Sequence, residues 1–88
     1  MFQIITTEFI EKFTALNNTV ADVHIKHLLY GNQKIKRCIL HPFVDGGCIG
    51  LTINNEDVYI TMDELQDASI KDNRCVIRSE VMELYIIL

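Results

Sequence analysis

The sequence of 88 residues lacks most of the features that identify a function directly. Its longest uninterrupted apolar run is far too short to span a bilayer, which takes about 20 apolar residues in a helix. It begins with no secretory segment, and its cysteines show no CxxC spacing. An odd number of cysteines (Cys38, Cys48 and Cys75) without such a segment predicts free thiols and a cytoplasmic location.

Proline occurs once and glycine four times. Pro42 cannot donate to a sheet ladder and Gly46-Gly47 permits unusual backbone angles, so residues 41–47 are predicted to form a connection. Internal repeats, linkers and low-complexity segments are absent from the sequence, which predicts a single domain over residues 1–88. The apolar fraction of 49% leaves two interpretations, a well-filled monomer core or a partner interface.

The charges are unevenly distributed along the chain. Residues 1–40 carry five Lys/Arg and three acids, whereas residues 41–88 carry three Lys/Arg and nine acids. This asymmetry bears on partners rather than on fold.

Residues 48–62 predict a β-hairpin, because apolar and polar residues alternate on both sides of a turn. A turn centred on Asn55-Glu56 pairs Ile53 with Val58, and a four-residue loop in the same register is equally compatible. In that register six apolar side chains share one face: Ile49, Leu51, Ile53, Val58, Ile60 and Met62.

Two helices are predicted. The first covers residues 6–16, with Thr6 or Thr7 as its cap and an apolar stripe at helical spacing (Phe9, Ile10, Phe13 and Leu16). The second covers residues 62–70, where Thr61-Met62-Asp63-Glu64 has the form of a capping box.

The other segments are predicted to be strands. Met1–Ile5 is a short apolar start, and residues 20–30 fit both strand and helix, the strand being favoured because β-branched residues alternate with polar ones. A turn at residues 31–33 then leads into residues 34–40 and pairs Ile25 with Ile39. Residues 74–78 and 81–88 complete the set, and the last run is apolar enough to require a central position, cover on both faces or an interface.

The predicted fold class is therefore α+β, a mostly antiparallel sheet of about five strands with two helices. Its element order is β-α-β-β-β-β-α-β(-β). Helices on one face leave the other face uncovered, so a homodimer through the C-terminal strand is one predicted arrangement.

Two groups of residues resemble sites of chemistry. His24, His27, Cys38 and His41 resemble a zinc-finger spacing, but residues three apart on a strand point to opposite faces, so no metal is predicted. Cys48 follows a glycine-rich loop with His41 and Asp45 nearby, as a thiol nucleophile would. A chain of this length supplies few walls for a substrate cleft, so neither an enzyme nor a cofactor is predicted.

Two charged surfaces suggest partners. The acidic residues Glu56, Asp57, Asp63, Glu64 and Asp67, with Tyr59 as an aromatic anchor, predict docking onto the basic patch of another protein. The favoured function is thus a non-catalytic, inhibitor- or immunity-like module, an analogy that rests on size and charge. The alternative is a small nucleic-acid-binding domain, as a monomer or a dimer, that uses the basic residues Lys34, Lys36 and Arg37 with Lys26 and His27.

Overall fold

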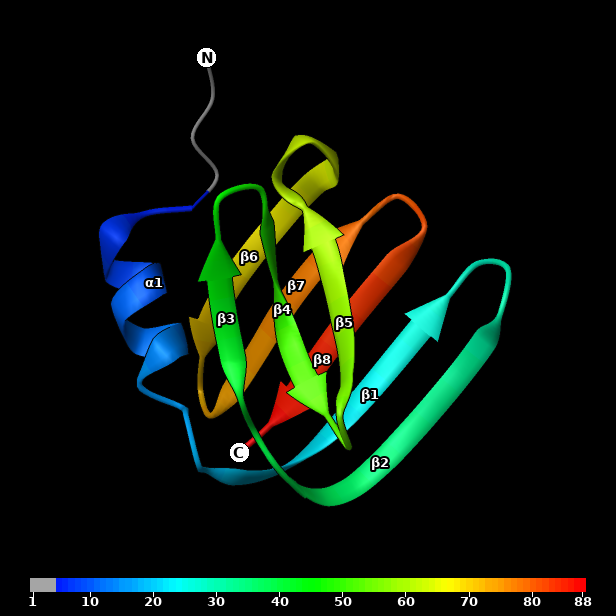
Figure 1. Cartoon of the computed structure of the whole chain (residues 1–88), viewed down its shortest axis with the longest axis horizontal. Coiled ribbons are helices and arrows are strands. Elements are labelled where there is room, and N and C mark those ends of the chain that lie inside the picture. Colours follow the sequence, from blue (N-terminus) through cyan, green and yellow to red (C-terminus); the bar gives the residue numbers. More distant parts are fainter. Residues whose placement is uncertain (1–4) are drawn as a thin grey trace.

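Two antiparallel sheets packed face to face make up most of the molecule (Figure 1). The computed structural model describes residues 5–88. Its elements are α1 (Thr7–Thr14), β1 (Val20–His27), β2 (Gly31–Ile39), β3 (Pro42–Asp45), β4 (Cys48–Ile53), β5 (Glu56–Thr61), the 3-10 turn η1 (Met62–Glu64), β6 (Leu65–Lys71), β7 (Arg74–Ser79) and β8 (Met82–Ile87). One sheet has the strand order β2-β1-β8-β7-β6, and the other has the order β3-β4-β5.

The core lies between the two sheets. Side chains with no exposed surface come from both layers: Val23, Ile77, Leu84 and Ile86 from the larger sheet and Ile49 and Leu51 from the smaller one. Removing such side chains from water stabilises the fold by about 1.5–3 kcal/mol each before conformational entropy is counted. The α+β class and the antiparallel sheet are confirmed, but the described residues form eight strands in two sheets and one α-helix.

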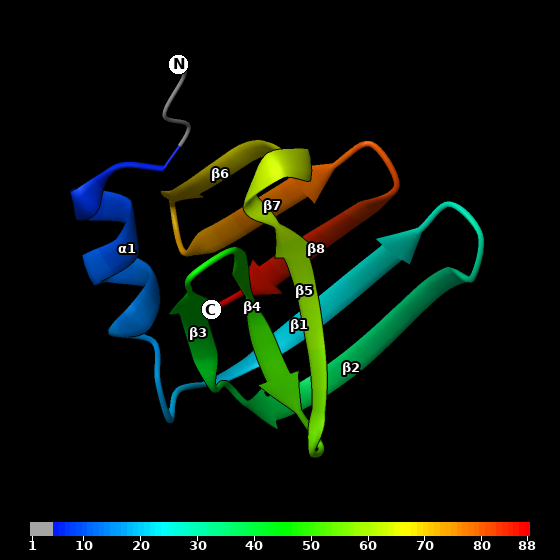
Figure 2. The same cartoon turned by 45° about the horizontal axis from the view of Figure 1, so that its top comes forward.

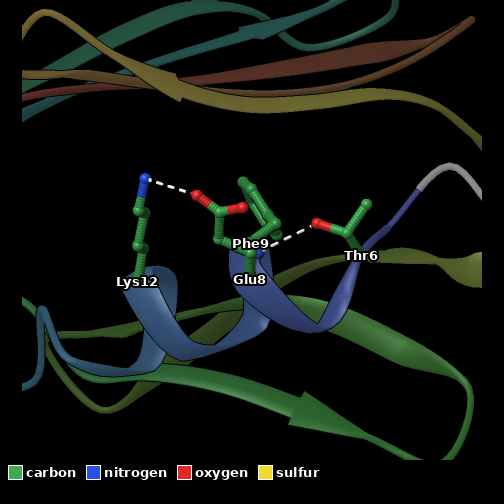
Figure 3. Close-up of polar contacts among 4 residues, drawn as sticks. All are labelled: Thr6, Glu8, Phe9 and Lys12. Carbon is green, nitrogen blue, oxygen red and sulfur yellow. Dashed lines mark hydrogen bonds and ion pairs between the residues drawn. The ribbon is translucent and has the colours of Figure 1, made fainter.

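Helix α1 begins after the predicted cap Thr6, and it ends at Thr14 rather than at the predicted residue 16. The hydroxyl of Thr6 accepts a hydrogen bond of 3.1 Å from the backbone amide of Phe9, and Lys12 Nζ lies 2.9 Å from a carboxylate oxygen of Glu8 (Figure 3). That hydrogen bond to Lys12 lowers the pKa of the Glu8 carboxyl. Phe9 and Phe13 are buried with stacked rings 5.6 Å apart, and α1 packs beside β3 and β6, at one side of the sandwich (Figure 2). Of the predicted strand Met1–Ile5, residues 1–4 lie outside the described part.

The β4–β5 hairpin has the predicted faces but a different register. The turn residues are Asn54 and Asn55, both with positive φ, so Ile53 opposes Glu56 and Leu51 opposes Val58. The predicted pairing of Ile53 with Val58 is wrong by two residues. A shift of two preserves the faces, because side chains alternate with period two. The six apolar side chains are therefore all buried or packed against the core.

The strand interpretation of residues 20–30 is confirmed for β1, but its predicted pairing with β2 is wrong. The turn consists of Leu28, Leu29 and Tyr30, and Val23 rather than Ile25 faces an isoleucine, Ile35. His27 fixes this turn, because its Nδ1 accepts hydrogen bonds from the amides of Leu29 (3.0 Å) and Tyr30 (3.3 Å). Side chain–backbone bonds of this kind were not visible in the apolar pattern.

The predicted helix at residues 62–70 is wrong. Only the 3-10 turn η1 forms, and the side chain of Thr61 makes no capping hydrogen bond. From Leu65 the chain runs as β6, which pairs with β7 through a turn at Asp72-Asn73, where both φ angles are positive. Pairing to a buried neighbour outweighs a weak local helix signal.

The predicted C-terminal strands are confirmed as β7 and β8. β8 lies between β1 and β7 and is hydrogen-bonded on both edges, which is the central position that its apolar sequence predicts. Both hydrogen-bonding edges of β8 are therefore occupied within the chain. The homodimer through the C-terminal strand stays a prediction.

Candidate functional site

The two sheets differ in the charges that they carry. Between Arg37 and Lys71 the chain contains no lysine or arginine, and this stretch includes the whole three-stranded sheet and η1. We call β3, β4, β5 and η1 the acidic layer, because its charged residues are all carboxylates: Asp45, Glu56, Asp57, Asp63 and Glu64. Within residues 5–88 none of these carboxylates forms an ion pair.

The five-stranded sheet carries every lysine and arginine except Lys12 of α1. On its outer face Lys26, Glu83 and Arg78 lie opposite one another on successive strands. Arg78 also opposes Asp67, with 3.9 Å between Nη2 and Oδ2. Opposite charges facing each other across strands attract. On this sheet Glu83 lies opposite both Lys26 and Arg78, and Arg78 pairs with Asp67, whereas the carboxylates of the acidic layer have no base among them.

Three of the predicted binding residues lie together on β5. Glu56 and Asp57 are exposed, and Tyr59 keeps 50% of its surface exposed. Asp57 and Tyr59 point to the outer face, because Val58 and Ile60 point into the core. The hydroxyl of Thr52 on β4 donates to Asp57 Oδ1 at 2.7 Å, which orients the carboxylate and leaves its other oxygen available.

Asp63 and Glu64 follow in η1, so they extend the acidic surface beyond the end of β5. Together with Glu80 they line a shallow depression between η1 and the β7–β8 turn. Asp67 does not join them. It lies on β6 with its side chain beside Arg78 on the outer face of the other sheet, because the predicted helix that would have grouped it with Asp63 is a strand.

Two residues of this face, Phe43 and Gly50, were not predicted from the sequence. Phe43 on β3, Gly50 on β4 and Tyr59 on β5 oppose one another in one row. Gly50 has no side chain between the two rings. An open notch on this face is lined by Phe43 and Tyr59 together with Asp45 and Asp57. The glycine that interrupts the β-rich run at residues 48–53 was the available signal.

The four residues with zinc-finger-like spacing, His24, His27, Cys38 and His41, are not brought together. In the described part of the chain no cluster of three or more His, Cys, Asp or Glu side chains is arranged to hold a metal ion. Nδ1 of His27 is occupied by the turn amides, and His41 lies 3.4 Å from Asn17 Oδ1. Cys38 is buried, its thiol donates to the carbonyl of Ala21 at 3.4 Å, and burial raises its pKa.

The nucleophile arrangement around Cys48 is also not assembled. Cys48 opposes Asp45, but the amide of Thr52 donates to the carbonyl of His41. His41 is therefore four residues along β4 from Cys48, about 13 Å at the rise of a strand. The side chain of Asp45 instead accepts the amide of Gly46 at 2.7 Å.

The chain matches no known protein family model, no curated protein and no solved structure. Among the described residues, no helix has the length and apolar character needed to cross a membrane.

Proposed function

We propose that this protein is a non-catalytic binding module that holds another protein through its acidic layer. The observation that carries the proposal is the concentration of uncompensated carboxylates on one sheet, with the half-exposed Tyr59 among them. The partner expected from this chemistry is a protein with a basic surface patch.

The carboxylates of the acidic layer give this sheet a negative electrostatic field. Charges of one sign on one surface raise the local concentration of oppositely charged partners and accelerate their association. Tyr59 adds a large, rigid contact that is typical of residues that dominate binding energy. An inhibitor- or immunity-like role, in which the module occupies a basic functional surface, fits both features.

Charge reversal tests the proposal. In Glu56→Lys/Glu64→Lys the acidic layer loses two carboxylates, whereas Glu8→Lys/Glu11→Lys makes the same change in net charge on α1. Each tagged variant is used to retain proteins from an extract of the native host, and the retained proteins are quantified by mass spectrometry. Loss of a basic protein with the first variant alone supports the proposal, whereas identical retention by both variants contradicts it.

A second candidate function is nucleic-acid binding by the outer face of the five-stranded sheet. It is favoured by the placement of nearly all basic residues on this sheet, where Lys34 opposes His24 and Lys26 Nζ lies 5.2 Å from the centre of the Tyr85 ring. Interleaved acids such as Glu83 weaken the field there. Binding of labelled single-stranded DNA and RNA at low and high salt tests it, because phosphate contacts make affinity fall steeply with salt. No binding at low salt, or binding unchanged in Lys26→Ala/Lys34→Ala, contradicts it.

A further inference from the structure

The strand edges of the two sheets are protected to different degrees. β3 and β6, at one side of the sandwich, lie beside α1 (Figure 2). β2 carries Lys34 and Lys36 and a register shift at Arg37, whose φ is +52° and whose amide bonds to Asp22 Oδ1 at 2.9 Å. Lysines and bulges on an edge discourage further pairing. β5 carries neither a lysine nor a bulge. Its only charged residues are Glu56 and Asp57 at its start, and residues 58–61 are uncharged.

The hydrogen-bond pattern defines which groups of β5 point outward. In a hairpin with a two-residue turn the flanking residues, Ile53 and Glu56, exchange hydrogen bonds, and every second pair does so after them. The bond from the amide of Met62 to the carbonyl of Gly47, 2.8 Å long, continues this pattern. The amides of Asp57, Tyr59 and Thr61 therefore point away from β4, and none of them donates elsewhere among the described residues.

We infer that β5 is a docking strand, on which an extended, basic segment of a partner protein pairs as a fourth strand of the acidic layer. The inference rests on the proposed function, for which it names the contact strand and the form of the partner. The main-chain groups of Asp57, Tyr59 and Thr61 supply the ladder, as in other complexes formed by strand addition.

The chemistry of the occupant follows from the side chains beside that ladder. Residues of the added strand that oppose Asp57 and Tyr59 lie on the same outer face as they do. A lysine or arginine there meets the carboxylate of Asp57 and the ring of Tyr59, which attracts cations through its face. An acidic segment would meet like charges.

A second copy of this chain is a poor occupant of the same edge. Pairing of β5 with β5 of another molecule would bring two acidic layers side by side, each with Asp45, Glu56, Asp57, Asp63 and Glu64 and without a lysine or arginine. Like charges at short distance repel and are not relieved by any base of this layer.

Thr61 offers a substitution that acts on the edge alone. Its φ is −71° and ψ is 148°, angles that proline adopts, and its amide makes no bond to β4. The preceding residue, Ile60, is already extended, as a residue before proline must be. Thr61→Pro thus removes one outward donor and places a ring at the edge, whereas Thr61→Val keeps the donor as a matched control.

The probe is a peptide of alternating lysine and threonine, with alternating glutamate and threonine as its counterpart. Titration into isotope-labelled protein is followed by NMR, with amide exchange measured for β5. We expect the lysine peptide alone to bind and to slow exchange at Asp57, Tyr59 and Thr61. Thr61→Pro should bind about tenfold more weakly, the effect of one or two lost hydrogen bonds, and Thr61→Val within about twofold of the wild type.

Three results would overturn the inference. The first is no binding of the lysine peptide to the wild type, and the second is equal binding by Thr61→Pro. The third is protection of the same amides from exchange in peptide-free protein, if that protection increases with protein concentration. This result would make a second copy of the chain the occupant. The proposed function is judged separately, because loss of the captured partner in Glu56→Lys/Glu64→Lys would support it even if Thr61→Pro retained that partner.

Discussion

Gly50 and Tyr59 face each other across β4 and β5 so closely that a Cβ atom on Gly50 would lie 2.8 Å from the Cβ of Tyr59. The same atom would also collide with the carbonyl oxygen of Val58, which belongs to the backbone and cannot rotate away. The glycine is therefore required by the close approach of its neighbours.

We expect Gly50→Ala to lower the free energy of unfolding by about 3 kcal/mol, because overpacking against backbone forces the two strands apart. Gly46→Ala is the matched control, since a Cβ there meets nothing within 4 Å. Urea denaturation followed by circular dichroism measures both variants. Equal stability of the two would show that β4 and β5 do not approach as described.

Thr6→Ala should lower the free energy of unfolding by about 1 kcal/mol, because the amide of Phe9 loses its capping acceptor. Thr7→Ala, one residue further along at an exposed position, should change it by less than about 0.5 kcal/mol. Thermal denaturation of both variants compares the two positions. A larger loss of stability with Thr7→Ala would show that Thr7 rather than Thr6 caps α1.

His27→Ala should loosen the β1–β2 turn without unfolding the domain. Leu28, Leu29 and Tyr30 are 75%, 77% and 85% exposed, so burial contributes little to the turn. It is held by the bonds to His27 Nδ1 and by the bond from the Leu28 amide to the carbonyl of Val81, which the substitution leaves in place. We expect faster amide exchange at Leu29 and Tyr30 and unchanged exchange in β8, since local opening is independent of the core. His24→Ala serves as the control, and faster exchange throughout the protein would contradict this local role.

Burial raises the pKa of the Cys75 thiol from 9.0 to about 12. Between these values the unfolded chain releases a proton that the folded chain keeps, so this thiol's contribution is complete below about pH 9 and is lost as the pH rises toward 12. Replacement by valine removes that part of the alkaline decline, up to about 1.4 kcal/mol per pH unit.

Urea denaturation at about pH 8, 9 and 10 gives the free energy of unfolding of the wild type and of Cys75→Val. The slope of this free energy against pH reports how many protons each protein releases on unfolding. Both proteins retain Cys38, so its contribution cancels. Parallel slopes would show that Cys75 is not buried as a neutral thiol.

Local patterns predicted the elements that their own residues specify. Periodicity and capping predict helix α1 and strands β4, β5, β7 and β8. They also predict the inward face of Ile49, Leu51 and Ile53. Periodicity could not set the β4–β5 register, because a shift of two residues leaves every side chain on the same face. The choice of Asn54-Asn55 over Asn55-Glu56 as the turn depends on two positive φ angles that asparagine tolerates.

The sequence by itself determined that the acids and bases are separated along the chain, and that one stretch without lysine or arginine contains all six residues of the predicted acidic docking surface. Only the tertiary structure decided that this stretch forms a separate sheet, that Asp67 leaves the group to lie beside Arg78, and that β5 keeps a free edge. The reason is that strand neighbours are chosen by burial and pairing between segments distant in sequence, which no local pattern records.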